Sequence, residues 1–297
     1  MASALRLQVH GAPAGAAEAG WAGVVEGFAA AEGALSRFRD DSDLTHLNRT
    51  AGSGTVAHAG GHLYRAISAA DRARRVTDGR FDARVLVDLE RLGDPGAPLP
   101  PGPVAAAPGS VGLVRRPRQR VLGLDRPYDL GGIGKGLALR WAWRRLAPLR
   151  AAASGVLLEA GGDLVAGGAP VGEPAWSVGI EDPRGGDEPL GVITVRDGAV
   201  CTSSVARRVW RAPDGRPVHH LIDPRSGEPG GDGLLAVTVA GSDPAWAEVW
   251  SKALFLAGSR AIGDLARTRG LAAWWVDLDG TLRMTPAARP RTAWLAE

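Results

Sequence analysis

A glycine-rich stretch, DLGGIGKGLA from Asp129 to Ala138, combines the residue types that can hold an anion. Its glycines let backbone N–H groups approach a phosphate where a helix begins, and Lys135 adds a positive charge. A P-loop would need Ser or Thr after the lysine, but Gly136 follows Lys135, and Asp129 stands where the first glycine should be. The dinucleotide-binding motif also fails, because no glycine has its spacing and no N-terminal β-α-β unit precedes it. The alternative is an ordinary turn from strand to helix, with Lys135 in solvent.

Three further segments carry polar groups suited to binding or proton transfer. Gly161–Asp163 follows a buried strand, where it forms either the rim of a binding site or a simple β-turn. His219 and His220 precede an Asp-Pro turn, and one of them could face a phosphate or hold a proton, or else satisfy a local hydrogen bond. Thr202–Ser204 supplies hydroxyls beside Arg207–Arg208, a set that suits phosphate or carbonyl contacts but also an edge strand.

The segment SDPAWAEVWSKALFLAG predicts a helix that Ser242 or Asp243 can cap. Glu248 and Lys252 lie four residues apart on it, so they share one face. The pair is either an ion pair that stabilises the helix or part of a metal site in which Glu248 is an oxygen ligand.

Composition excludes several classes of protein. The chain has 297 residues, 35 of them basic and 32 acidic, for a net charge of +3, and its arginines are spread along the sequence, so a nucleic-acid partner is not expected. Cys201 is the only cysteine, which excludes an internal disulfide and a multi-cysteine zinc site. No apolar run is long enough to span a bilayer, so we expect no membrane insertion. The N-terminal MASALRLQVHG lacks the apolar core of a signal peptide, which predicts a cytoplasmic protein unless the given sequence omits a leader.

Hydrophobic periodicity predicts a mixed order of strands and helices. We expect helices over residues 18–38, 61–79, 133–147, 244–258 and 260–270. Strands are expected over residues 5–11, 110–114, 120–124, 156–162, 176–180, 191–195, 198–204, 234–241, 272–278 and 280–284. We expect residues 39–50 to form a loop and the Pro-rich residues 93–110 to form a surface excursion. This order predicts an α+β fold with mixed, largely antiparallel sheets and packed helices.

Six segments, taken in their order along the chain, resemble the motifs of the ApbE family of FAD:protein FMN transferases. They are SRFRDDSDLTHLN, DGRFDARV, DLGGIGKG, GGDL, TSS and HLIDPRSG. Each is weak alone, but six in the right order over nearly the whole chain are specific. The resemblance implies one ApbE-like domain over residues 1–297, or two interleaved subdomains. It also implies an enzyme that cleaves FAD at its pyrophosphate, passes the FMN phosphoryl group to a Thr or Ser hydroxyl of an acceptor flavoprotein, and releases AMP.

The resemblance also implies roles for particular residues, with FAD as the substrate and Mg²⁺ as the cofactor. FAD-contacting positions are Met1, Phe38, Gly79, Arg80, Phe81, Asp129, Lys135, Thr202, Ser203, Leu221 and Ile222. The catalytic positions are Lys135 and His220, and His220 matches the histidine that assists removal of the proton from the incoming hydroxyl. Positions that match the metal site are Gly132 through its carbonyl, Glu248, Ser251 and Lys252.

Three positions depart from the family's pattern. The family's N-terminal M-G-T is Met1–Ser3 here, and its T-S-G is Thr202–Ser204. In the metal helix, where the family has A-D-x-x-[AS]-T-A, Glu248 replaces the aspartate and Lys252 replaces the threonine ligand. An ammonium has no lone pair for a metal. Either Mg²⁺ binds through Glu248, the Gly132 carbonyl, Ser251 and waters, or Lys252 takes over part of the metal's charge, and our hypothesis is an active enzyme with weakened or altered metal dependence.

Two other functions fit the same motifs. A pyrophosphatase would use water in place of the acceptor hydroxyl and give FMN and AMP. A non-catalytic flavin-binding protein would hold FAD without turnover, and the Lys252 replacement favours that alternative. An α+β protein without any ligand is the remaining interpretation.

Overall fold

The computed structural model describes residues 4–96, 114–116 and 118–296. The predicted flavin contact at Met1 and residues 97–110 of the Pro-rich segment lie outside these residues. The chain divides into two compact, interleaved units. Unit 1 comprises Ala29–Gly134 and Arg208–Pro229, and unit 2 comprises Ala2–Phe28, Lys135–Arg207 and Gly230–Glu297.

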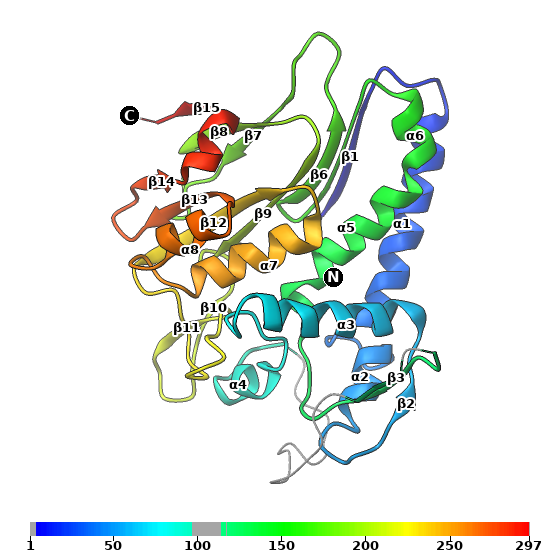
Figure 1. Ribbon diagram of the computed structural model, residues 1–297, viewed down its shortest axis with the longest axis vertical. Helices are drawn as coiled ribbons and strands as arrows, with labels where there is room; N and C mark the ends of the chain where they lie inside the picture. The colour runs from blue at the N-terminus through cyan, green and yellow to red at the C-terminus, as the bar shows by residue number, and fades with distance from the viewer. Residues whose placement is uncertain (1–3, 97–113, 117, 297) are drawn as a thin grey trace. The chain divides into compact units, whose positions relative to one another are not determined.

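Unit 2 contains a seven-stranded antiparallel sheet with the order β1-β5-β6-β9-β12-β13-β14 (Figure 1). Its strands are β1 (Leu5–His10), β5 (Gly155–Ala160), β6 (Asp163–Gly168), β9 (Gly198–Ser204), β12 (Leu234–Gly241), β13 (Ala272–Asp277) and β14 (Leu282–Met284). A two-residue turn joins β5 to β6, and Gly161 and Gly162 adopt φ values of 58° and 89° there. Glycine is favoured at both positions because a hairpin turn of this length needs positive φ. The β-turn interpretation of Gly161–Asp163 is therefore confirmed.

One face of this sheet packs against a smaller sheet of unit 2. The smaller sheet has the order β15-β8-β7, from β15 (Thr292–Leu295), β8 (Gly191–Val195) and β7 (Trp176–Ile180), and the 3₁₀ helix η2 (Pro286–Arg291) precedes β15. Leu157 of β5, Ile193 of β8 and Trp274 of β13 belong to one apolar cluster, and Trp274 and Ile193 have no exposed surface. Burial of such side chains is the main stabilising term for this part of the fold.

Helices cover the other face. Helix α7 (Pro244–Phe255) packs along β9 and β12 (Figure 1). The remaining helices with residues in unit 2 are α1 (Ala16–Leu35), which continues into unit 1, α5 (Gly134–Arg145), α6 (Ala147–Ala152) and α8 (Ile262–Thr268). Because side chains alternate along a strand, Val200 of β9 joins the apolar cluster, while Cys201 and Ser203 point to α7, where they contact Pro244 and Ser251. The side chains of Ser203 and Ser251, which are considered below, lie on this helical face.

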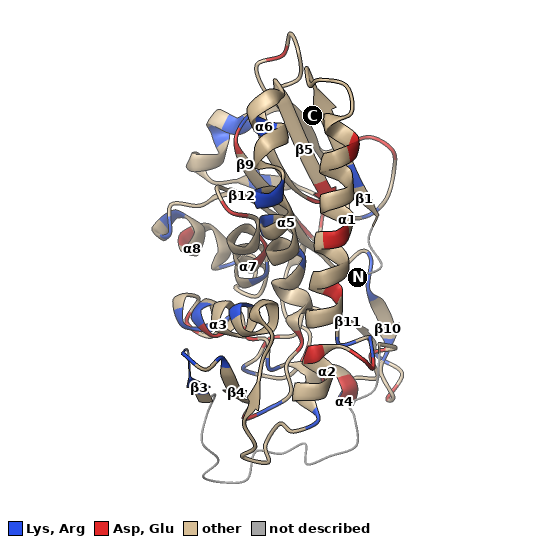
Figure 2. Ribbon diagram, turned by 90° about the vertical axis from the view of Figure 1, so that its right-hand side faces the viewer, with Lys and Arg blue, Asp and Glu red and all other residues tan. Residues whose placement is uncertain are grey.

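Unit 1 is built from short elements. Its helices are α2 (Asp43–Asn48), α3 (Gly61–Val76), α4 (Leu86–Arg91) and the 3₁₀ helix η1 (Leu130–Gly132). Its strands are β2 (Ala57–His58), β3 (Val114–Arg116), β4 (Val121–Gly123), β10 (Val209–Arg211) and β11 (Pro217–His219), in the sheets β2-β4-β3 and β10-β11. Basic and acidic residues both occur along α3 (Figure 2). A small apolar cluster joins α4 to the β10-β11 hairpin through Leu89, Leu92 and Val218.

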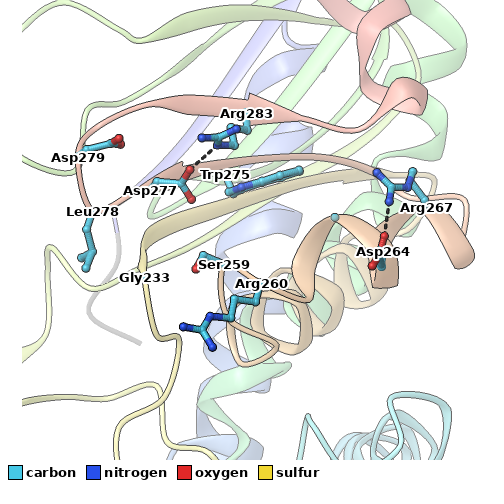
Figure 3. Close-up of a pocket in the computed structure, with 11 residues that line it drawn as sticks. Gly233, Ser259, Arg260, Asp264, Arg267, Trp275, Asp277, Leu278, Asp279 and Arg283 are labelled. Atoms are coloured by element: carbon cyan, nitrogen blue, oxygen red, sulfur yellow. Dashed lines mark hydrogen bonds and ion pairs between the residues drawn. The ribbon is translucent and has the colours of Figure 1, made fainter.

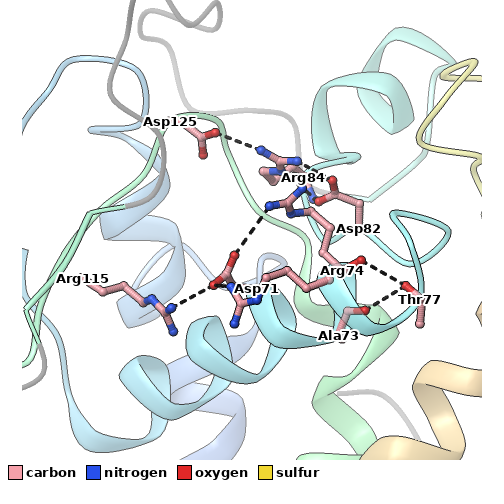
Figure 4. Close-up of polar contacts among 9 residues, drawn as sticks. Asp71, Ala73, Arg74, Thr77, Asp82, Arg84, Arg115 and Asp125 are labelled. Atoms are coloured by element: carbon pink, nitrogen blue, oxygen red, sulfur yellow. Dashed lines mark hydrogen bonds and ion pairs between the residues drawn. The ribbon is translucent and has the colours of Figure 1, made fainter.

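Ion pairs and a threonine fix the chain after α3 (Figure 4). Thr77 Oγ1 donates to the Ala73 carbonyl at 2.8 Å and accepts from the Phe81 N–H at 3.0 Å. Arg84 contacts Asp82 at 2.6 Å and Asp125 at 3.0 Å. These contacts hold the segment DGRFDARV, one of the six motifs, in a defined turn.

The predicted α+β class with largely antiparallel sheets is confirmed, because every strand pair in the described chain is antiparallel. The prediction of a loop over residues 39–50 is wrong in part, since α2 occupies its centre. Ser42 caps α2 by accepting a hydrogen bond from the Thr45 N–H at 3.0 Å. This serine therefore marks the start of a helix and not a turn within a loop. None of the helices that the structure describes is both long enough and apolar enough to cross a membrane.

Candidate active site

Three residues of unit 2, each from a different motif, meet at the carboxylate of Asp163. Lys135, the second residue of α5, places its Nζ atom 2.6 Å from Asp163 Oδ2. The backbone N–H of Thr202 donates to the other oxygen, Oδ1, at 3.0 Å. Asp163 is 1% exposed, and these two hydrogen-bond partners offset the cost of burying its carboxylate. Burial alone would lower the pKa of Lys135, but the carboxylates of Asp163 and Glu248 outweigh it and raise that pKa, so Lys135 carries its charge at neutral pH.

Helices α5 and α7 approach each other closely at Gly136. A Cβ atom at this position would lie 2.5 Å from the Pro244 carbonyl oxygen and 2.6 Å from Ala245 Cα. The Gly136 N–H donates to Glu248 Oε2 at 2.8 Å. The close approach explains why glycine, and not the Ser or Thr of a P-loop, follows Lys135.

Glu248 is completely buried, and its second oxygen, Oε1, lies 3.3 Å from Lys252 Nζ one turn later on α7. Burial raises the pKa of the Glu248 carboxyl, and the ammonium groups of Lys252 and Lys135 oppose that rise. The ion-pair interpretation of Glu248 and Lys252 is thus confirmed, although the pair is buried and not on a solvated face. Asp243 caps the same helix by accepting from the Trp246 N–H at 3.1 Å.

Ser251 lies between these residues and β9. Its Oγ donates to the Glu248 carbonyl at 2.9 Å and lies 2.7 Å from Ser203 Oγ. A hydroxyl has one proton, so Ser203 is the donor in the second contact. Thr202 Oγ1 points to the opposite face of the sheet, where it lies 2.9 Å from Thr238 Oγ1. Thus the hydroxyls of Thr202 and Ser203 serve different faces.

The family implies a divalent cation, and the side chains of unit 2 do not fit one. The Glu248 oxygens accept from the Gly136 N–H and the Lys252 ammonium, and that ammonium would repel a cation at the remaining lone pairs. The Ser251 oxygen accepts from Ser203, and Lys252 has no lone pair. No group of three His, Cys, Asp or Glu side chains in the described part of the chain could hold a metal ion. The Gly132 carbonyl, the remaining predicted ligand, belongs to unit 1, at the end of η1.

In unit 1, the predicted FAD contact Asp129 is held by a buried arginine. Asp129 caps η1 by accepting from the Gly131 N–H at 2.7 Å, and its other oxygen accepts from Arg37 Nε at 3.0 Å. Arg37 also pairs with Asp94, which pairs in turn with Arg208 at 2.8 Å. Burial would raise the pKa of Asp94, but the Gly96 N–H and the Arg37 and Arg208 guanidinium groups outweigh it and lower that pKa.

The same arginines surround Phe38, the predicted aromatic contact for FAD. The Phe38 side chain is 52% exposed. The Arg37 guanidinium lies 4.2 Å from the centre of its ring, and that of Arg208 lies 5.9 Å away. Both distances are within the range of cation–π attraction. An exposed aromatic ring supported by a buried arginine is therefore available to stack against a planar ligand.

The other predicted contacts of unit 1 have mixed environments. Gly79 adopts a φ of 74° in the turn after α3, Arg80 is half-buried, and Phe81 is 4% exposed, so the Phe81 side chain belongs to the core. His220 is half-buried, and its backbone N–H donates to the Arg208 carbonyl at 3.3 Å. Leu221 and Ile222 are both 4% exposed, which leaves their backbone, as predicted, as the part that could contact a ring.

A pocket of about 630 Å³ lies elsewhere in unit 2, beside α8, β13 and β14 (Figure 3). Arg267 pairs with Asp264 there, and Arg283 pairs with Asp277. None of the predicted site residues lines this pocket. It is therefore separate from the residues discussed above.

The structure thus gathers the predicted residues in two groups. Lys135, Ser203, Glu248, Ser251 and Lys252 lie on the helical face of the unit 2 sheet. In unit 1, Phe38 and Asp129 share the Arg37 network. The residues that hold these groups together are Asp163, Gly136, Arg37 and Asp94. The sequence indicated a possible binding role for Asp163, as part of the rim Gly161–Asp163, but Gly136, Arg37 and Asp94 were not among the predicted FAD, catalytic or metal positions. The motif GGDL draws attention to Asp163, because this residue directly follows the two glycines. The sequence does not reveal its partner Lys135, which lies 28 residues away.

Comparison with known proteins identifies the same family as the sequence motifs. The model of the ApbE family matches residues 1–275. The FAD:protein FMN transferase of Salmonella typhimurium is 28% identical over 261 residues, which cover 83% of this chain and 73% of that protein. The protein of the same name from Treponema pallidum is 30% identical over 255 residues, covering 75% of this chain and 67% of that protein.

Two solved structures resemble the fold closely. The crystal structure of the ApbE protein of Thermotoga maritima matches with a TM-score of 0.83 at 25% identity, over 97% of this chain and 96% of that one. The apo form of the flavinyl transferase ApbE of Pseudomonas stutzeri matches with a TM-score of 0.76 at 25% identity, over 97% and 96% of the two chains. The fold therefore agrees over nearly the whole chain.

Proposed function

The chain belongs to the ApbE family, and from this premise we propose that it is an FAD:protein FMN transferase. The acceptor is a protein that presents a Thr or Ser hydroxyl. Relatives of 28% and 30% identity carry the name of this activity, and the predicted resemblance is confirmed. We also propose roles for particular residues, a role for Mg²⁺ and a class of acceptor protein.

The proposed reaction is a phosphoryl transfer. The acceptor hydroxyl oxygen bonds to the phosphorus of the FMN half of FAD, and the bond from that phosphorus to the bridging oxygen breaks. AMP leaves with the bridging oxygen, and His220 takes the hydroxyl proton. Negative charge on the phosphoryl oxygens needs fixed positive partners, and Lys135 at the start of α5 supplies one. Phe38 stacks on a ring of FAD, and Asp129 and the backbone at Gly79–Phe81 and Leu221–Ile222 complete the binding residues.

One observation carries this proposal: Lys135, Asp163 and Thr202, from three different motifs, are joined by contacts of 2.6 and 3.0 Å. These contacts fix a charged ammonium at the start of a helix whose glycines allow a phosphate to approach. The solvated-lysine alternative does not account for this arrangement, because Asp163 is 1% exposed.

The proposal is tested by incubating the purified protein with FAD and an acceptor domain that contains the target threonine. We expect the acceptor to gain the mass of an FMN group, with release of one AMP for each FMN transferred. Lys135→Met should abolish the gain, whereas Arg216→Gln, which removes an exposed cation, should leave it unchanged. AMP and free FMN without a mass gain would assign the pyrophosphatase reaction instead, and bound FAD without either product would assign a binding protein.

In the proposed reaction, Mg²⁺ is not essential for transfer. Because the donor set of unit 2 is incomplete, we propose an enzyme whose transfer depends only weakly on Mg²⁺. The acceptor is proposed to be a flavoprotein. We further propose that both units serve a single transferase domain over residues 1–297. The cytoplasmic location stays a prediction.

A further inference from the structure

Lys252 stands at a position that the family resemblance assigns to a metal ligand, and its ammonium contacts the buried carboxylate of Glu248. Glu248 has no exposed surface, and a carboxylate so deeply buried needs a positive partner. Its Oε1 lies 3.3 Å from Lys252 Nζ, and the Lys252 side chain is 15% exposed. An ammonium has three N–H donors, so Lys252 can pair with Glu248 and still donate to a second anion.

Charge in this part of unit 2 is already balanced. The two ammonium groups, Lys135 and Lys252, match the two buried carboxylates, Asp163 and Glu248. A divalent cation beside Glu248 would meet the Lys252 ammonium, and like charges at contact distance in a buried site repel strongly. Replacing Lys252 by a neutral residue would leave one uncompensated carboxylate, which favours a cation. The charge balance at Glu248 therefore depends on the side chain of Lys252.

We infer that the Lys252 ammonium is a built-in cation that replaces the divalent metal of this site and provides its positive charge for the pyrophosphate of the substrate. The inference rests on the proposed function. The inference goes beyond weakened metal dependence, because it assigns the replacement of the metal to Lys252 alone. A single substitution should therefore reverse that replacement. Lys252→Thr should restore a site for a divalent cation, with Glu248 as its acidic ligand.

Binding of Mn²⁺ alone to the full chain, followed by electron paramagnetic resonance without FAD or acceptor, tests the inference directly, since Mn²⁺ takes the oxygen ligands that Mg²⁺ takes. We expect Lys252→Thr to bind Mn²⁺ at least about tenfold more tightly than the wild type, because a repelling charge is removed. The double variant Glu248→Gln/Lys252→Thr should lose the gain. Lys252→Arg, which keeps the charge, should behave as the wild type and controls for disturbance of α7.

FAD binding in the presence of EDTA supplies the second readout. The wild type should bind FAD equally well with EDTA or Mg²⁺, whereas Lys252→Thr should bind it at least about tenfold more weakly in EDTA and recover with Mg²⁺. Tight Mn²⁺ binding by the wild type that Glu248→Gln abolishes would overturn the inference, as would no gain in Lys252→Thr. Failure of the proposed function gives a different result, because FMN transfer would then be absent under every metal condition while the binding data still report on Lys252.

Discussion

Lys135 Nζ lies 2.6 Å from Asp163 Oδ2, and this contact ties the start of helix α5 to the first residue of strand β6. The remaining oxygen of Asp163 accepts the Thr202 N–H from β9 at 3.0 Å. One buried carboxylate therefore sets the relative positions of the motifs DLGGIGKG, GGDL and TSS. Its removal should affect both the stability of unit 2 and the charge that Lys135 presents.

Asp163→Asn keeps the shape of the side chain but removes its charge. We expect a loss of about 2 kcal/mol in the free energy of unfolding, because the partly buried Lys135 ammonium loses its charged hydrogen-bond partner. Chemical denaturation at pH 7 measures the change. Asp214→Asn, which breaks the exposed pair of Asp214 and Arg216, is the control and should leave the unfolding curve unchanged. Equal effects of the two substitutions would contradict the role of Asp163.

Gly136→Ala should destabilise the packing of α5 against α7. The new Cβ would lie 2.5 Å from the Pro244 carbonyl oxygen, so the helices must separate, at a cost of about 1–3 kcal/mol. The matched control is Gly23→Ala in α1, where nothing lies within 4 Å of the added Cβ. That substitution should stabilise the helix by roughly 0.5–1 kcal/mol. Thermal denaturation of both variants should therefore show shifts of opposite sign, and a rise in Tm for Gly136→Ala would refute the close contact.

Local patterns predicted most elements, since apolar periodicity and helix caps act over a few residues. The helices over 61–79 and 244–258 correspond to α3 and α7, and the glycines at 161 and 162 form the predicted turn. The pattern of residues 39–50 indicates a loop because Asp and Ser suit turns as well as helix caps, and α2 has only six residues. Helix α4 and the β10-β11 hairpin were missed for the same reason, because elements this short depend on tertiary packing.

The candidate site shows the same limit at the level of side chains. The family resemblance identified Lys135 and Asp129, but the sequence does not show that Arg37 contacts Asp129 across 92 residues. Nor does it show that Gly136 donates to Glu248 across 112 residues. These contacts arise from the packing of distant elements, which a single sequence does not encode in any local pattern. They decide which motif residues have a charge available for a ligand.

Asp94 should make the stability of unit 1 depend on pH. Its pKa in the folded protein is lowered, so the ionised carboxylate stabilises the fold above the unfolded pKa of about 3.9, and this contribution disappears as the pH falls through the folded pKa. Asp94→Asn lacks the contribution at every pH. We expect the variant to unfold at lower urea concentration than the wild type at pH 7. The two midpoints should converge below the folded pKa. A gap that stays constant on acidification would contradict the ion-pair role of Asp94.

His220→Gln should separate chemistry from binding. A glutamine can keep hydrogen bonds but cannot take the hydroxyl proton, so we expect transfer to slow by about 10²–10⁴-fold. FAD binding should change little, because the proposed ring contacts come from the Leu221–Ile222 backbone and from Phe38. AMP release in single-turnover experiments measures the first quantity, and flavin fluorescence measures the second.

The matched control for this prediction is His58→Gln, which changes an exposed histidine of β2 in the same unit. It should leave both transfer and FAD binding at the wild-type level. If His220→Gln weakens FAD binding as much as it slows transfer, the histidine positions the flavin and does not act as the base. If it slows neither, the proton goes to another acceptor, and the role assigned to His220 from the motif HLIDPRSG is wrong. Only a loss of transfer with FAD binding preserved agrees with proton removal by His220, because a base acts on the hydroxyl and not on the flavin.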